Sequence, residues 1–299
     1  MRIALLGAAF SAGGAHPGCR HAPEVFRERE YANWRRRLAR QQLTLSIFWA
    51  GIVREENPLP LPMYSASARR ELLRNSQRLM RRTLRLRRGG MLPVVIGGDH
   101  SCAIGTWTGI AGAQRRPMGL LWIDAHLDAH TRESSDSQRL HGMPLAVLLG
   151  EGDQPLARMG GLSPVLDPRY CAVIGVRSFE EEEPLRLARL GVRFYTREEI
   201  ARRGLPAVVA EAWRRVAAAP GGFGVTLDLD VLDPALAPGV SVPEPGGLHP
   251  GKLAALLSRQ PHKQRLRGLE IVELNPQHDP GGQTLRLLPK LMTAMLMRR

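Results

Sequence analysis

Residues 119–128 read GLLWIDAHLD, an apolar run followed by Asp124, His126 and Asp128. A short, continuous apolar run is typical of a strand that is buried on both faces of a sheet. Similar runs recur and alternate with longer segments in which apolar residues form helical rows, as in 67–88. The runs are 3–7, 92–96, 119–123, 171–176, 192–195, 224–229 and 266–272. This alternation predicts a three-layer α/β/α fold with a mostly parallel central sheet.

The chain of 299 residues has no linker, repeat or low-complexity tract, and 43% of its residues are hydrophobic. That content suffices for a sizeable core, so we expect one domain over residues 1–299. No run of about 18 apolar residues occurs, which predicts a soluble protein without a membrane span. The odd and sparse set of cysteines (Cys19, Cys102 and Cys171) provides no disulfide framework and favours a cytoplasmic location.

The formal net charge of +14 and the pI near 11.0 raise the question of nucleic-acid binding. The arginine runs are 35–37, 69–70, 81–82 and 87–88. They lie in segments with a helical pattern and lack interleaved aromatic residues that could stack on bases. We therefore interpret them as solvated helix faces and do not expect a nucleic acid as partner.

Polar residues follow four of the predicted strands. These segments are 97–101 (GGDHS), 124–128 (DAHLD), 228–230 (DLD) and 273–276 (ELNP). The carboxyl ends of parallel strands meet at one edge of a sheet, where such folds bind ligands. In extended backbone, residues two apart point the same way, so the ligands in 124–128 can converge, and those in 228–230 likewise. We therefore expect one shared site.

The candidate ligands are four carboxylates and two imidazoles, without a thiolate. They are His100, Asp124, His126, Asp128, Asp228 and Asp230. Such a set suits Mn²⁺ and does not suit a structural zinc cluster. Four adjacent carboxylates repel one another unless cations lie between them, and six ligands with bridging carboxylates imply two ions. Each motif alone fits an ordinary cap or turn, but the three motifs behind three apolar strands favour a metal site.

At these residues the chain resembles the arginase (ureohydrolase) family, especially its bacterial members. The likeness runs over 3–276, and the motifs that carry it are 97–101, 122–128 and 227–234. The resemblance implies two Mn²⁺ per subunit. One ion would be held by His100, Asp124, Asp128 and Asp228, and the other by Asp124, His126, Asp228 and Asp230.

The resemblance also implies hydrolysis of a guanidinium group, most specifically of L-arginine to L-ornithine and urea by a metal-bridging hydroxide. The amine leaves only when it is protonated, and Asp128 at the edge of the metal site is suited to carry that proton. His141 stands at the proton-shuttle position of the family, although an ordinary histidine at a helix N-terminus also fits. Glu273 follows an apolar strand, where its carboxylate would pair with the guanidinium.

Substrate choice depends on groups far from the metals, because L-arginine differs from agmatine by one α-carboxylate. Ser137 stands where arginases place a serine that contacts this carboxylate. His130 replaces the usual Asn and could still donate to it, while Glu180 or Glu183 could accept from the α-ammonium. The acidic run 180–183 fits equally well a solvated start of a helix.

Other functions stay open on the sequence alone. Segment 175–180 departs from the Arg-Asp-x-Asp pattern of arginases, and 243–247 looks like agmatinase members. The alternatives are an agmatinase or a hydrolase of another guanidino acid or of formiminoglutamate. An inactive scaffold of the same fold is a further alternative, against which the complete ligand set and Glu273 argue. The family also implies a homo-oligomer, a trimer or hexamer, with the arginine-rich helices or the helix at 284–297 as candidate interfaces.

Overall fold

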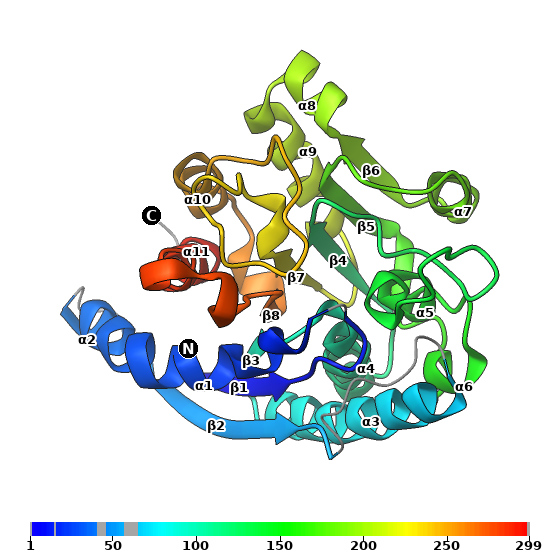
Figure 1. Ribbon diagram of the computed structural model, residues 1–299, viewed down its shortest axis with the longest axis horizontal. Coiled ribbons are helices and arrows are strands. Elements are labelled where there is room, and N and C mark those ends of the chain that lie inside the picture. Colours follow the sequence, from blue (N-terminus) through cyan, green and yellow to red (C-terminus); the bar gives the residue numbers. More distant parts are fainter. Residues whose placement is uncertain (1, 15, 41–45, 57–64, 298–299) are drawn as a thin grey trace.

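The computed structural model describes residues 2–14, 16–40, 46–56 and 65–297. Eight strands form one sheet in the order β2-β1-β3-β8-β7-β4-β5-β6, and every neighbouring pair is parallel (Figure 1). The strands are β1 (Arg2–Ala9), β2 (Ser46–Arg54), β3 (Leu92–Gly97), β4 (Met118–Ile123), β5 (Leu166–Val176), β6 (Arg193–Thr196), β7 (Phe223–Asp228) and β8 (Leu266–Val272). The predicted α/β/α fold is confirmed.

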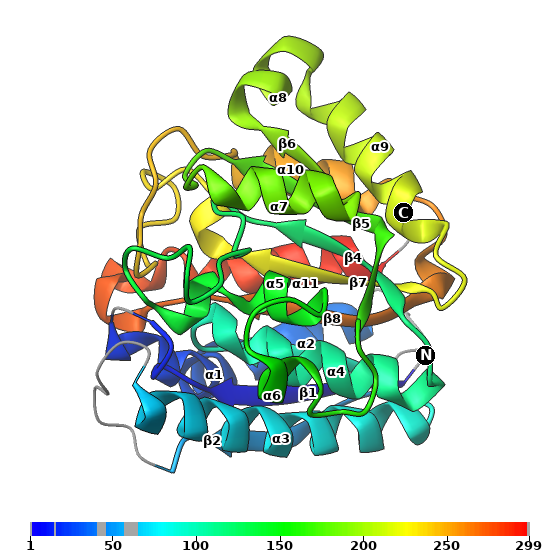
Figure 2. The same cartoon turned by 90° about the vertical axis from the view of Figure 1, so that its right-hand side faces the viewer.

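Helices cover both faces of this sheet (Figures 1 and 2). One face packs against α1 (Ala22–Phe26), α2 (Ala32–Arg40), α9 (Leu205–Ala217), α10 (Pro250–Ser258) and α11 (Leu288–Leu296). The other packs against α3 (Ala66–Arg88), α4 (Ala103–Gln114), α5 (Pro144–Leu148) and α7 (Glu182–Leu190). The short helices α6 (Gln154–Ala157) and α8 (Arg197–Arg203) complete the set in the described residues.

The two faces of the sheet are both apolar, as β1 illustrates. Ile3 and Leu5 belong to the core beneath α1 and α2, whereas Ala4 and Leu6 belong to the core beneath α3. Alternate residues of a strand point to opposite faces, so a strand covered on both sides reads as a continuous apolar run. This is why the apolar runs of the sequence mark the central strands.

Two elements differ from the prediction. β2 was not predicted; it lies at the edge of the sheet, and most of its residues are only half-buried, so it lacks a continuous apolar signal. The helix predicted at 284–297 begins only at Leu288, after a 3-10 turn at Leu285–Leu287. Positive φ angles at Gly281 and Gly282 prevent a helix from extending further towards the N-terminus.

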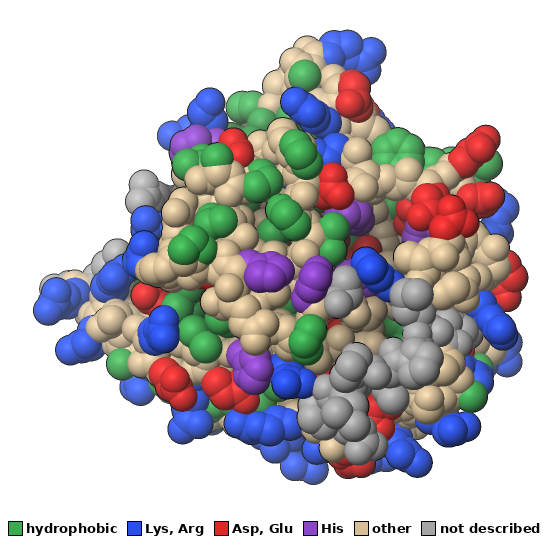
Figure 3. All heavy atoms as spheres, in the orientation of Figure 1, with side chains coloured by type: hydrophobic (Ala, Val, Ile, Leu, Met, Phe, Trp, Pro, Cys, Tyr) green, Lys and Arg blue, Asp and Glu red, His purple; other side chains and the backbone are tan. Residues whose placement is uncertain are grey.

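The arginine runs lie on α2 and α3, as the helical pattern predicts. Residues 35–37 are exposed, whereas Arg69 pairs with Asp153, and Arg82 donates to the carbonyl of Ala50. On the face in Figure 3, most Lys and Arg side chains lie near the periphery, and a few lie singly nearer the centre. None of the described helices has the length and apolar character that a bilayer span requires.

Candidate metal centre and active site

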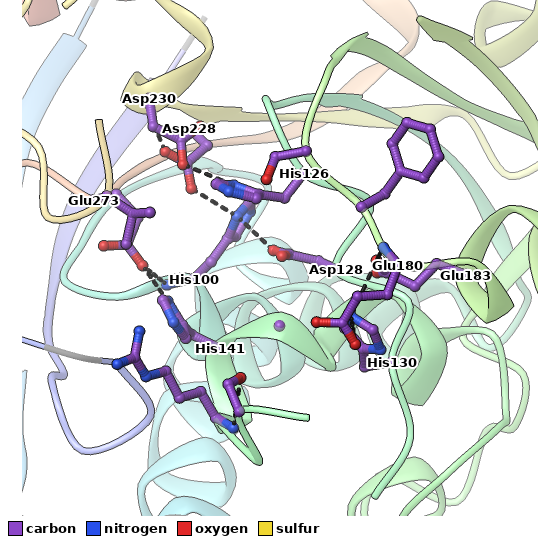
Figure 4. Close-up of a pocket in the computed structure, with 16 residues that line it drawn as sticks. His100, His126, Asp128, His130, His141, Glu180, Glu183, Asp228, Asp230 and Glu273 are labelled. Atoms are coloured by element: carbon purple, nitrogen blue, oxygen red, sulfur yellow. Dashed lines mark hydrogen bonds and ion pairs between the residues drawn. The ribbon is translucent and has the colours of Figure 1, made fainter. Parts of the chain in front are cut away.

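The polar segments after β3, β8, β7 and β4 meet at one edge of the sheet, because these four strands are adjacent. They surround a cavity of about 220 Å³ (Figure 4). Its lining includes His100, His126, Asp128, His130, Ser137, His141, Glu180, Glu183, Asp228, Asp230 and Glu273. Asp124 lies directly beside them and is fully buried. The sheet thus brings together all the candidate residues singled out in the sequence.

The first cluster surrounds the imidazole of His100, which is stacked on Trp122 with ring centroids 4.3 Å apart. Nδ1 of His100 lies 3.0 Å from a carboxylate oxygen of Asp124, 3.0 Å from Asp128 and 3.1 Å from Asp228. Despite these approaches, this buried nitrogen has no hydrogen-bond partner of good geometry among the described residues. Three carboxylates therefore converge on one unsatisfied nitrogen.

The other ring nitrogen of His100 fixes its tautomer. Nε2 lies 3.0 Å from Oγ1 of Thr226, which itself donates to the carboxylate of Glu270 at 2.9 Å. The hydroxyl of Thr226 must then accept from Nε2–H, which leaves a lone pair on Nδ1. A lone pair facing three carboxylates is repulsive unless a cation lies between them. The arrangement therefore fits a bound metal, with Glu270 and Thr226 orienting the ligand from behind.

A second cluster shares Asp124 with the first. Nδ1 of His126 lies 3.0 Å from Asp230 and 3.5 Å from Asp124. The ligand atoms of Asp124, His126 and Asp230 lie within 4.8 Å of one another, as do those of His100, Asp124 and Asp128. The two clusters form candidate metal-binding groups that meet at one carboxylate.

The backbone reaches this convergence by turning, which corrects the extended geometry expected from the sequence. The chain leaves β4 at Ile123, and Asp128 adopts a φ of 50°. Glu273 has a φ of 63°, and Asp230 lies in a 3-10 turn at Leu229–Val231. Positive φ is uncommon for residues other than glycine and clusters at functional sites.

A glycine before His100 is required by close packing. A Cβ on Gly98 would lie 1.9 Å from the carbonyl oxygen of Phe10, and φ of Gly98 is not positive. Lack of space for a side chain, and not a left-handed backbone, therefore explains the glycine at this position. The close approach of the β1 and β3 ends brings the loop after β1 beside the site.

His141 and Glu273 form a pair beside the first cluster. Nδ1 of His141 donates to Oε1 of Glu273 at 3.0 Å, so its Nε2 remains available. Burial lowers the pKa of His141, but the hydrogen bond and charge of Glu273 outweigh it, and the pKa lies above its ordinary value. His141 lies in a 3-10 turn at Leu140–Gly142, before α5, and not at the start of a helix.

Cys19 is a contact of this pair that no sequence motif indicated. Its Sγ donates to Oε2 of Glu273 at 3.3 Å and lies 2.8 Å from Oγ of Ser241. Burial raises the pKa of the Cys19 thiol well above its usual value, so the thiol stays neutral and can donate. Glu273 is thus held by three protein groups: His141, Cys19 and the backbone N–H of His100.

The loop after β1 holds the backbone of His141 through a hydrogen bond. The carbonyl of Gly13 accepts from the backbone N–H of His141 at 3.0 Å. The backbone N–H groups of Ser11 and Ala12 donate to one carboxylate oxygen of Glu55, at 2.8 and 2.7 Å. Burial, followed by the charge of a nearby carboxylate, raises the pKa of Glu55 to about 7. A titratable group therefore holds the loop on which His141 rests.

The rim of the cavity is organised by Glu183, which is 2% exposed. One carboxylate oxygen accepts from the backbone N–H of Ala129 at 3.0 Å. The other accepts from the backbone of Glu180 at 3.1 Å and lies 3.0 Å from Nε2 of His130. Nδ1 of His130 lies 3.3 Å from Oγ of Ser134. Both nitrogens of His130 are therefore engaged, contrary to the free carboxylate donor that the sequence suggested.

The acidic run 180–183 divides between its two predicted roles. Glu182 is exposed in the first turn of α7, as expected of a solvated helix start. Glu183 is buried, and its carboxylate links the loops after β4 and β5 by accepting from the backbone N–H of Ala129. Glu180 lines the cavity with a side chain that is 41% exposed, so it can still accept from a ligand. Ser137 also lines the cavity and is exposed.

Five further lining residues were not predicted as site residues: Arg139, Gly142, Ser178, Phe179 and Val242. Arg139 and Phe179 border the cavity beside Ser137 and Glu180, and Phe179 is 46% exposed. No sequence pattern distinguishes Arg139 from the many other arginines of the chain. Two carboxylate-rich clusters that share Asp124 and lie next to a histidine–glutamate pair fit the arrangement of metal-assisted hydrolases.

Comparison with known proteins gives the family. The model of the arginase family matches residues 1–297. Arginase from Agrobacterium fabrum is 33% identical over 309 residues, covering 99% of this chain and 90% of that protein. Arginase from Bacillus caldovelox is 39% identical over 206 residues, 69% of each chain. Its crystal structure matches with a TM-score of 0.89 and 31% identity, covering 100% of this chain and 99% of that one. The chain belongs to the arginase family and is a hydrolase.

Proposed function

We propose that the protein is an arginase, which hydrolyses L-arginine to L-ornithine and urea within one ureohydrolase domain. The observation that carries this proposal is the pair of His–Asp clusters sharing Asp124, with the His141–Glu273 pair in the same cavity. The arginases among its relatives, which match the chain from end to end, support the same activity.

The donor set favours two Mn²⁺ ions. His100, Asp124, Asp128 and Asp228 would hold one ion, and Asp124, His126, Asp228 and Asp230 the other. Such hard oxygen and imidazole donors suit Mn²⁺. The bound pair would supply a nucleophile at neutral pH, because divalent cations lower the pKa of water.

Glu273 would position the guanidinium. Its Oε1 is occupied by His141 and the backbone of His100, whereas among the described residues Oε2 has only the weak thiol donor of Cys19. Oε2 therefore has capacity to accept from a guanidinium N–H. Burial raises the pKa of Glu273, but the hydrogen bond and the charge of His141 outweigh this effect, so the pKa lies below its ordinary value. The carboxyl is therefore ionised and suited to a cationic partner.

Asp128 and His141 would handle the protons. Attack of water on the guanidinium carbon releases one proton, and the carbon–nitrogen bond breaks only when the departing nitrogen gains one. Asp128 lines the cavity beside His100 and would carry that proton across. His141 would exchange a proton with solvent through Nε2, since Nδ1 is committed to Glu273. The overall reaction consumes one water molecule and yields an ammonium group and urea.

The test is urea release by the Mn²⁺-loaded protein with L-arginine, agmatine, 4-guanidinobutyrate and guanidine, at neutral and alkaline pH. Formiminoglutamate is followed in parallel through formamide. We expect L-arginine to have the highest kcat/KM. Preference for another compound would replace the substrate while keeping the chemistry, and no turnover of any would favour a scaffold of the same fold.

A further inference from the structure

Arg139 occupies an unusual position for an arginine. It lines the cavity, it is half-buried, and its guanidinium has no hydrogen-bond or ion-pair partner in the part of the chain that the structure describes. The guanidinium groups of two other arginines near the site are engaged in hydrogen bonds within the protein. Arg177 donates to backbone carbonyls, including those of Asp230 and Glu244, and Arg186 donates to the carbonyl of Ala129. Arg139 alone of these three remains available to a ligand.

Arg139 is a cationic side chain in a cavity whose lining is mainly acidic. Carboxylates dominate the lining, with Asp128, Asp228, Asp230 and Glu273 at the bottom and Glu180 and Glu183 on the rim. In Figure 4, Glu273 and His141 lie on one side, and His130, Glu180 and Glu183 lie on the other. Arg139 precedes His141 by two residues and belongs to the loop on the first side. The mouth thus offers an acidic wall and a basic group.

A substrate that carries both an ammonium and a carboxylate matches such a mouth. Glu180 can accept from the ammonium. For the carboxylate, His130 is not free, because its two nitrogens face Ser134 and Glu183. Ser137 offers one hydroxyl. A guanidinium offers two parallel N–H donors and a charge, the strongest complement of a carboxylate.

We propose that Arg139 is a specificity-determining residue that binds the substrate carboxylate and selects guanidino acids over guanidino amines. This inference rests on the proposed guanidine hydrolysis and deepens it by assigning the group that recognises the far end of the substrate. A decarboxylated substrate loses this contact and brings an ammonium towards a cationic side chain. Charge-assisted hydrogen bonds at a half-buried site predict a preference of about 10- to 100-fold in kcat/KM.

The decisive experiment combines one substitution with one change in the substrate. Urea release from L-arginine is compared with release from L-argininamide, which carries a neutral carboxamide in place of the carboxylate. In Arg139→Ala, kcat/KM for L-arginine should fall about 10- to 100-fold, mainly through KM, while the value for L-argininamide stays within about twofold. Arg139→Lys should recover part of the loss, because it keeps the charge without the two-pronged geometry.

Arg70→Ala is the matched control, since Arg70 is exposed on α3, lies outside the cavity lining and removes the same net charge. It should leave both substrates unchanged. Equal losses on both substrates in Arg139→Ala, or no loss on either, would overturn the assignment. If Arg139→Ala does not fold, Arg139→Gln provides the same comparison.

Binding of products separates this inference from the proposed function. L-ornithine and 1,4-diaminobutane are titrated calorimetrically into the wild-type protein and Arg139→Ala. A preference for L-ornithine that disappears in the variant supports Arg139 even without turnover, and a preference that persists overturns it. Absence of urea release by the wild type from every guanidine would instead overturn the proposed function.

Discussion

The floor of the cavity and its rim are built from different parts of the fold. Floor side chains stand at the ends of adjacent central strands or in the turns directly behind them. They are His100, Asp124, His126, Asp128, Asp228, Asp230 and Glu273, and all are buried except His126, whose side chain is 26% exposed. Rim side chains stand on the longer loops after β4 and β5, where Ser137 is exposed and the side chain of Glu180 is 41% exposed. Strand ends are fixed by the sheet, whereas loops accept substitutions. A change in the floor should therefore reduce turnover of every guanidine, and a change in the rim should depend on the guanidine.

The largest effect is expected from Asp128→Asn in the floor. The change would remove the charge of a proposed metal ligand together with the proposed proton carrier, and we expect kcat to fall about 10⁴-fold. Asparagine tolerates positive φ, so the turn at Asp128 should persist. Urea release and bound metal are measured on the same Mn²⁺-loaded sample.

Asp136→Asn serves as the control for that variant, because Asp136 is an exposed carboxylate in the loop that follows Asp128. It should retain wild-type turnover. Near-normal kcat in metal-replete Asp128→Asn would show that Asp128 neither carries the proton nor tunes the metals.

His141→Asn tests the boundary between floor and rim. Its amide can still donate to Glu273, so the carboxylate should keep its orientation, and only the proton exchange through Nε2 is lost. We expect kcat to fall about 10²-fold with KM and metal content nearly unchanged. Steady-state kinetics and elemental analysis measure these quantities; a variant that loses its metal would mean that His141 belongs to the metal centre.

Glu183→Gln tests the rim. Glutamine keeps one acceptor oxygen, but its NH₂ group would face a backbone N–H, of Ala129 or Glu180, from which the carboxylate now accepts a hydrogen bond. We expect KM for L-arginine to rise about tenfold with kcat within about twofold, and the unfolding free energy to fall by about 1 kcal/mol. Glu182→Gln, on the exposed face of the same helical turn, is the matched control and should behave as wild type. A loss of kcat and metal in Glu183→Gln would show that rim and floor are not separable.

The sequence predicted the floor far better than the rim. The strand at Leu266–Val272 was predicted with its observed bounds, and the positions of the candidate ligands behind β3, β4 and β7 follow directly from the apolar runs. A parallel sheet places strand ends together, so strand recognition suffices to bring the six candidate ligands together. The positive φ of Asp128 has no such signal, because it depends on contacts that only the folded chain makes.

The rim depends on pairings between loops, which periodicity does not encode. The engagement of His130 by Glu183 joins the loops after β4 and β5, residues that are 53 positions apart and follow no strand pattern. Cys19 reaches Glu273 across 254 positions in the same way. The residue types of His130 and Glu183 indicated candidate chemistry, whereas nothing in the sequence indicated Cys19; in each case the partner decides which atoms remain free for a substrate.

The smallest effect on turnover is expected at Glu55, which supports His141 through the loop after β1. Burial and the charge of Asp99 raise the pKa of Glu55 from 4.5 to about 7 against the hydrogen bonds it accepts. Because the folded pKa lies above the unfolded one, the carboxyl contributes stability below about pH 4.5, and this contribution is lost as pH rises through about 7. Glu55→Gln is neutral at every pH, and its oxygen can still accept from Ser11 and Ala12.

From about pH 6 to about pH 8, the wild-type unfolding free energy should therefore fall by about 1 kcal/mol more than that of Glu55→Gln. Denaturant unfolding of the metal-loaded proteins at the two pH values measures the difference. Glu56→Gln, at the exposed neighbouring carboxylate that pairs with Arg78, should keep the wild-type slope. Parallel slopes for wild type and Glu55→Gln would assign the titration to another group. A kcat within about twofold of wild type in Glu55→Gln would fit a support that holds His141 through the carbonyl of Gly13 and takes no part in proton transfer.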